Sequence, residues 1–132
     1  FIKKLLIFMK KVKISVGRHE IIVVLRNTDT ANAIYKSSPF TSNINIWGKE
    51  IYFDTNIKVE KEYDSKQIID KGEIAFWVEG SAIAIGFGPT PVSVKDEIRL
   101  VTDANIFGDT NFEVVLLEEI KSGETVSVEK CE

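Results

Sequence analysis

The segment that most constrains the fold is residues 72–91, which reads GEIAFWVEGSAIAIGFGPTP. It predicts two strands, Glu73–Val78 and Ala82–Phe87, joined by a tight turn at Gly80-Ser81. The run Ile74–Val78 is continuously apolar, as expected of a strand that is covered on both faces. A fold built around this pair therefore needs packed side chains on both sides of a sheet.

The second of these strands runs into a rigid loop. Gly86 and Gly88 flank Phe87, so the backbone there can bend or be approached closely. Pro89 and Pro91 then fix the exit path. A stiff loop beside a buried strand, with aromatic residues around it, favours a pocket at this end of the sheet.

Length and charge limit the class of protein. The 132 residues suit one domain, which we expect over residues 9–132. Apolar residues make up 44% and charged residues 28%, which excludes a wholly disordered chain. The net charge is −3, and Arg18, Arg26 and Arg99 are the only arginines. Nucleic acid is therefore not an expected partner, because phosphate binding needs a clustered basic face.

The chain ends suggest little chemistry. We expect residues 1–8, which precede Met9, to be an upstream extension or a start-site artefact, either disordered or lengthening the first strand. The apolar run Leu5–Met9 is too short for the core of a signal peptide, and no segment approaches the roughly 18 apolar residues of a membrane span. The lone cysteine, Cys131, allows no intramolecular disulfide, which suits a cytoplasmic location.

Alternation and turn signals predict most of the remaining elements. Residues 11–25 read as a hairpin that leaves His19 in an exposed turn. Residues 27–30 are a helix-start signature, and the short helix must end before Pro39. Residues 47–50 form the turn of a second hairpin. We expect further strands over 57–63, 112–120 and 125–130, the last pairing near the N-terminal strand, and a loop over 92–103.

This pattern predicts a mainly β fold. Eight to ten short strands with one or two short helices are typical of a closed barrel or a sandwich. Closure is favoured because it leaves no long sheet edge open to aggregation.

Four strings in the chain resemble a known family. They are SPFTSNINIWGKEIYF at residues 38–53, GEIAFW with FGPTP inside 72–91, and NIFG at 105–108. In order and spacing, nearly the whole chain from Met9 resembles the atypical cyclophilin-like proteins of archaea and bacteria. The resemblance implies a closed cyclophilin-like barrel of about eight strands with one or two short helices. Asp109-Thr110 departs from the family pattern, where a basic residue is expected, and this argues against anion binding at that corner.

The resemblance does not carry over an activity. Classical cyclophilins isomerise X–Pro bonds with an arginine that reaches into an apolar groove, and this chain lacks their motif of an arginine followed by Phe and a Gln-Gly-Gly stretch. Arg99 is the only arginine near the predicted loop, so it is the candidate catalytic residue of a weak isomerase.

No standard enzyme signature is present. The segment 86–91 lacks the third glycine of a dinucleotide fingerprint, and no Ser/His/Asp set can be proposed. No metal site or cofactor is expected, because His19 has no second histidine and no usable cysteine beside it. The carboxylates, Glu50 among them, are interpreted as solvated turn groups, because Asp and Glu are seldom buried.

Aromatic and amide groups are the better candidates for a ligand site, since pockets are mostly apolar with a few aimed polar groups. Trp47, a large aromatic in a bend, also suits a homodimer interface, whereas Trp77 and Phe87 can be interpreted simply as core. The full set of candidate ligand-binding residues is Tyr35, Phe40, Asn45, Trp47, Trp77, Phe87, Thr90 and Asn105.

Three functions therefore remain open. The first is a module that binds a peptide or a small molecule in an aromatic groove. The second is the weak peptidyl-prolyl isomerase. The third is an assembly domain or a partner of an amide-hydrolysing enzyme, which rests only on the fold analogy with enzymes related to allophanate hydrolase.

Overall fold

The N-terminal hairpin forms as its alternation predicts. In the computed structural model, which describes residues 9–131, β1 (Lys11–Val16) pairs with β2 (His19–Leu25) in antiparallel register. The apolar residues of β1 are fully or almost fully buried, and its lysines face outward. On its other side β1 pairs with β10 (Thr125–Cys131), which confirms that the C-terminal strand lies beside the N-terminal one. β3 (Phe40–Asn43) then adds to β10.

The central strand pair of the sequence forms the other half of the barrel. β7 (Glu73–Trp77) pairs with β8 (Ala82–Gly86), β8 pairs with β5 (Glu50–Asp54), and β5 pairs with β4 (Asn45–Ile46). Every residue of β8 is buried. The prediction that this pair is covered on both faces is thus confirmed.

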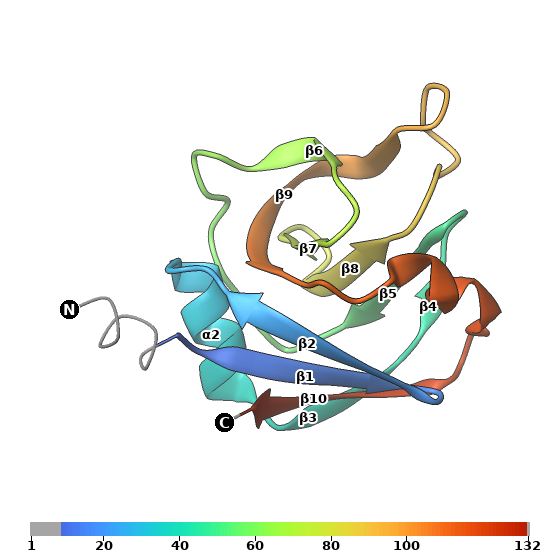
Figure 1. The fold of residues 1–132 in the computed structure, drawn as a ribbon. Coiled ribbons are helices and arrows are strands. Elements are labelled where there is room, and N and C mark those ends of the chain that lie inside the picture. The colour runs from blue at the N-terminus through green and yellow to red at the C-terminus, as the bar shows by residue number, and fades with distance from the viewer. Residues whose placement is uncertain (1–8, 132) are drawn as a thin grey trace.

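A long strand, β9 (Ile98–Asp109), joins the two halves. It pairs with β2 on one side and β7 on the other, and β6 (Lys66–Ile69) pairs with its N-terminal part. The strand order is β3-β10-β1-β2-β9-β7-β8-β5-β4, so the sheet curls into a nearly closed barrel with one seam (Figure 1). Near that seam the hydroxyl of Ser42 on β3 donates to the carbonyl of Asp54 on β5, at 2.7 Å.

Two short helices accompany the strands in the described part of the chain. α2 (Asp29–Ser37) begins where predicted, because the hydroxyl of Thr28 accepts a hydrogen bond from the Ala31 amide at 3.1 Å. It ends before Pro39, and its apolar face packs on one end of the barrel core (Figure 1). The second, η1 (Val114–Glu119), is a 3-10 helix.

Side chains pack in two layers on either side of β7 and β8. The main core fills the barrel and contains Ile51, Phe53 and Phe76. A second, smaller cluster lies on the outer face of the same strands, and its members are Ile69, Ala75, Ala84, Ile98, Leu100, Ala104 and Ile106, with Tyr52 packed against it. The outer layer is where the candidate site is found.

Three expected elements are wrong. Residues 112–120 are no strand: Val114 and Leu117 are buried at a spacing of three, which suits a 3-10 turn. Residues 57–63 alternate but pair with no strand, because the Asn105 side chain binds the backbone of residues 60 and 62 instead. The expected loop over 92–103 contains the first half of β9, whose period of two was missed.

The prediction that His19 is an exposed turn residue is also wrong. This residue begins β2 with 8% of its surface exposed, and its Nε2 lies 2.7 Å from Oε1 of Glu119 on η1. Its ring packs edge to face against Phe112. The reason is that η1 folds back over the hairpin turn, and such a long-range contact leaves no local signal.

The expectations for residues 1–8 concern a segment outside the described residues. Among residues 9–131, no helix combines the length and the apolar character needed to cross a membrane.

Gly108 permits the close approach of β2 and β9, which gives a stability prediction. A Cβ at this position would lie 2.4 Å from Cγ1 of Val23 and 3.0 Å from the carbonyl oxygen of Val24. We expect Gly108→Ala to lower the free energy of unfolding by about 1–3 kcal/mol, measured by urea denaturation. The control is Asp103→Ala, at an exposed position of the same strand, which should change stability by less than about 0.5 kcal/mol. Equal effects of the two substitutions would contradict the packing argument.

Candidate functional site

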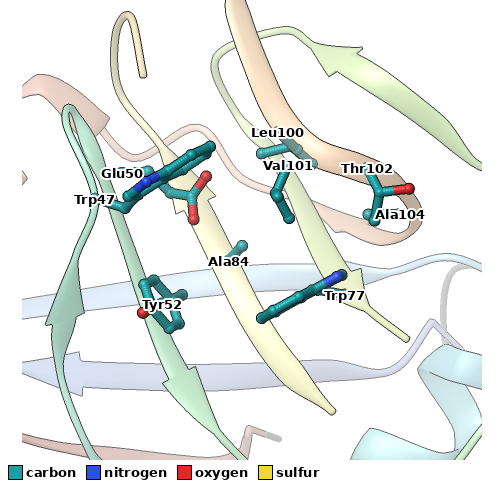
Figure 2. Close-up of a pocket in the computed structure, with 9 residues that line it drawn as sticks. All are labelled: Trp47, Glu50, Tyr52, Trp77, Ala84, Leu100, Val101, Thr102 and Ala104. Carbon is teal, nitrogen blue, oxygen red and sulfur yellow. The ribbon is translucent and has the colours of Figure 1, made fainter. Parts of the chain in front are cut away.

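The path of β9 creates a pocket on the outer face of the barrel. Its C-terminal part pairs with β7, with a shift of register between Ile74 and Ala75, and the part up to Ala104 pairs with β6 instead. Between this part of β9 and strands β5, β7 and β8 lies a cavity of about 180 Å³. Figure 2 shows the nine lining residues: Trp47, Glu50, Tyr52, Trp77, Ala84, Leu100, Val101, Thr102 and Ala104.

Strand alternation selects which side chains enter this pocket. On β5, Ile51 and Phe53 point into the barrel core. Glu50 and Tyr52 therefore point to the opposite face, where the pocket is. Across the ladder Tyr52 pairs with Ala84, and this small side chain leaves space in the floor of the pocket.

The turn that carries Trp47 forms one wall of the pocket, and backbone hydrogen bonds hold this turn in place. Trp47 donates its backbone N–H to the carbonyl of Glu50 at 3.0 Å, which closes the turn between β4 and β5. The loop after β8 holds this turn from outside: the Phe87 N–H donates to the Lys49 carbonyl at 2.8 Å, and the Lys49 N–H donates to the Pro89 carbonyl at 3.0 Å. The rigid loop predicted from the sequence thus positions the tryptophan and does not line the pocket itself.

The aromatic side chains enclose the cavity from different strands. Tyr52 and Trp77 meet edge to face, with ring centroids 6.5 Å apart and planes at 89°. Trp47 lies on the opposite side of the pocket from Trp77, with Ala84 between them (Figure 2). The arrangement suits a flat ring or an apolar group lying against aromatic surfaces.

Glu50 is the ionisable group that stands out in this pocket. Only 6% of its surface is exposed, and its Oε1 has no hydrogen-bond partner in the described part of the chain. Burial raises the pKa of this carboxyl from its ordinary 4.5 to about 7. Near neutral pH it can therefore accept or donate a proton, or accept a hydrogen bond from a bound molecule. The indole Nε1 of Trp77 is likewise buried and unpartnered among the described residues.

The structure brings two of the predicted ligand-binding residues together. Trp47 and Trp77 line the same pocket, although they are thirty positions apart in the sequence. Asn45 lies beside this site, since it pairs with Tyr52 across the β4–β5 ladder, but it is not among the lining residues.

The other aromatic candidates lie elsewhere. Phe87 is 7% exposed and belongs to the main barrel core. Tyr35 on α2 is half-buried, and the ammonium groups of Lys10 and Lys130 lie 4.9 and 5.2 Å from its ring centroid. Phe40, at the start of β3, lines a separate, more polar hollow beside α2.

The polar candidates hold the fold together. The Thr90 hydroxyl donates to the Arg99 carbonyl. The guanidinium of Arg99 forms an ion pair with Glu97, with Nε and Oε2 2.7 Å apart. Asn105 is fully buried, and its amide nitrogen donates to the Thr30 hydroxyl and to a backbone carbonyl, each at 2.9 Å.

Sequence reasoning missed Glu50 and Tyr52 as site residues. Glu50 was interpreted as one solvated carboxylate among many, which is wrong because it is buried in a pocket that part of β9 helps to enclose. A local signal existed: Glu50 and Tyr52 share one face of the strand that begins three residues after Trp47. Nothing local, however, shows that residues 100–104 return to cover that face.

Comparison with known proteins identifies the fold. A family model described as Cyclophilin-like matches residues 10–129. The solution structure of the hypothetical protein AF2241 from Archaeoglobus fulgidus is 35% identical; the match covers 93% of this chain and 95% of that one, with a TM-score of 0.80. These matches confirm the resemblance seen in residues 38–53 and 72–91.

A second solved structure is more distant. The structure of McbB in complex with tryptophan is 16% identical, with a TM-score of 0.63; the match covers 89% of this chain and 44% of that one. This likeness concerns the fold alone. The comparison with curated proteins gave no match.

The buried Glu50 carboxyl gives a pH prediction. Because its pKa is raised in the folded chain, that chain keeps a proton between pH 4.5 and about 7 which the unfolded chain has released. Stability due to this group is therefore present below pH 4.5, falls as the pH rises to about 7, and then levels off. Relative to Glu50→Gln, the free energy of unfolding of the wild type should fall by roughly 3 kcal/mol as the pH rises through this window.

Urea denaturation of both chains at several pH values between 4.5 and 8 measures this difference. Glu79→Gln is a matched control, because the hydrogen bond from Lys61 lowers the pKa of that exposed carboxyl and its small contribution has the opposite sign. A difference between wild type and Glu50→Gln that does not vary with pH would show that Glu50 is not desolvated.

The braced turn gives a second prediction. Gly48 has φ +60°, and an added Cβ would lie 2.8 Å from Cδ of Pro91 and 2.9 Å from Cα of Thr90. We expect Gly48→Ala to cost about 2–5 kcal/mol, because backbone strain of about 1–2 kcal/mol adds to an overpacking cost of about 1–3 kcal/mol, and to change the tryptophan fluorescence. Gly123→Ala is the control, since Gly123 has φ +91° but open space around it, so its cost is limited to backbone strain of about 1–2 kcal/mol. Similar losses in both variants would argue against the bracing.

Proposed function

This chain belongs to the cyclophilin-like family, and we propose that it is a binding module that holds a small ligand, or one side chain of a peptide, in the pocket between Trp47, Tyr52 and Trp77. The fold alone does not fix a function, so the proposal rests on the site. The observation that carries it is the buried, unpartnered carboxyl of Glu50 inside an aromatic cavity.

The cost of keeping such a group supports a binding role. A buried polar atom without a partner destabilises the fold by roughly 1–3 kcal/mol. Residues of this kind in a concave, mostly apolar pocket are typical of ligand sites, where the polar group sets the orientation of the bound molecule. A bound molecule that supplied a hydrogen bond to Oε1 of Glu50 would offset that cost.

The size of the cavity favours a ligand group with one or two rings. An engineered cavity of about 150 Å³ binds benzene, and the pocket here, about 180 Å³, is slightly larger and open on one side. The distant structural neighbour McbB was solved with tryptophan. Indoles are therefore sensible first probes.

The two alternatives from the sequence remain predictions. The isomerase reading needs Arg99, whose guanidinium pairs with Glu97 and is not among the pocket-lining groups. The reading as a partner of an amide-hydrolysing enzyme has no observation in its favour in the described residues.

Titration with indole tests the binding proposal. The titration is followed by two-dimensional NMR on ¹⁵N-labelled protein. Indole should shift the side-chain N–H resonances of Trp47 and Trp77, with a Kd on the order of 0.1–1 mM. Trp77→Ala should weaken binding about tenfold or more, because it removes one aromatic wall.

Tyr63→Ala provides the control, since Tyr63 is fully exposed and away from the pocket; this variant should bind indole like the wild type. Unchanged tryptophan resonances, or equal binding by Trp77→Ala, would rule out this pocket as the site.

A further inference from the structure

We propose that the ligand of this pocket is an organic cation, an ammonium group on a ring-bearing molecule, held by the Glu50 carboxylate and the surrounding aromatic faces. This inference rests on the binding function proposed above and names the chemical class of the ligand.

The charge of the lining is the first argument. The nine lining residues include one carboxyl group, that of Glu50, and no Lys, Arg or His. The only other ionisable side chain in the lining is the phenol of Tyr52. The pocket therefore offers a potential negative charge with no positive charge inside it.

The basic side chains that neighbour the pocket are paired with other carboxylates. Lys49 directly precedes Glu50, but its Nζ lies 3.6 Å from Oε1 of Glu118 on η1. Arg99 directly precedes Leu100 of the lining, and its guanidinium pairs with Glu97. Lys66, which pairs with the lining residue Ala104 across the β6–β9 ladder, is likewise bound to Glu73, with Nζ 2.8 Å from Oε1. These three basic residues are thus paired with other carboxylates, and the place of a counter-ion to Glu50 is left for the ligand.

The aromatic faces favour the same ligand class. The face of an aromatic ring carries a negative quadrupole, which attracts a cation within about 6 Å of the ring centroid. Trp47, Tyr52 and Trp77 surround one cavity together with the carboxyl group (Figure 2). Cages of this composition suit an ammonium ion better than an anion, which both the quadrupoles and an ionised Glu50 repel.

The ionisation of Glu50 near neutral pH lowers the free-energy cost of binding a cation. Since burial raises its pKa to about 7, a large share of the carboxyl is already ionised at pH 7.5. An ammonium group that donates to Oε1 would satisfy the unpartnered atom and stabilise the ionised form. A neutral indole can offer that oxygen only an uncharged N–H, whose hydrogen bond is weaker than the charge-assisted one of an ammonium group, and a carboxylate would face like charge.

Three indoles of similar size test this ranking: tryptamine, which carries an ammonium group, neutral 3-methylindole, and the anion indole-3-propionate. Their Kd values are measured at pH 7.5 by the shifts of the two tryptophan side-chain resonances. For the wild type we expect tryptamine to bind at least tenfold more tightly than 3-methylindole, and indole-3-propionate to bind most weakly.

Two variants locate the source of the preference. Glu50→Gln should reduce the tryptamine preference to within about threefold of 3-methylindole. Glu79→Gln removes the same charge from an exposed position paired with Lys61, and it should keep the wild-type ranking. An equal loss of preference in both variants would trace the preference to net charge and overturn the inference.

The wild-type ranking alone is decisive if Glu50→Gln does not fold. If 3-methylindole binds as tightly as tryptamine, the cation inference is wrong while the binding function stands. If none of the three probes shifts the tryptophan resonances, the pocket is no ligand site for these classes and both proposals fall.

Discussion

The short antiparallel contact between β2 and β9 joins the two halves of this barrel. It consists of two register pairs, Val24 with Asp109 and Leu25 with Gly108, followed by a hydrogen bond from the Arg26 amide to the Phe107 carbonyl. The guanidinium of Arg26 reinforces the junction, since it lies 2.8 Å from Oδ1 of Asp109 and 3.3 Å from the Glu73 carboxylate on β7. The opposite side of the sheet ends in a seam, so the closure of the barrel depends on this one ladder.

The strand that closes the barrel also builds the pocket. The C-terminal half of β9 completes the sheet, whereas its N-terminal half pairs with β6 and forms one wall of the cavity. Fold and candidate site therefore share one continuous backbone segment. The turn that carries Trp47 approaches from the opposite wall, where the loop after β8 holds it.

Local patterns in the sequence predict those elements well whose structure is determined by interactions within the element itself. Alternation and turn residues identify the N-terminal hairpin and the pair β7–β8, and the capping residues at 27–30 identify the start of α2. The misses have long-range causes. η1 packs against His19, and the Asn105 side chain bonds the backbone of residues 60 and 62 in place of a neighbouring strand. Residues 100–104 help to enclose the pocket that Glu50 lines. Family motifs gave the fold, but the site depends on contacts between segments that are distant in the sequence.

The hydrogen bonds that hold the Trp47 turn in place also affect the free energy of ligand binding. Two backbone hydrogen bonds and two prolines fix this wall before any ligand arrives. A molecule that enters a preformed cavity loses less binding free energy to the ordering of loops and side chains. Substitutions at small lining positions such as Ala84 or Thr102 can then reshape the cavity while its frame stays intact, so one scaffold could serve different ligands in different relatives.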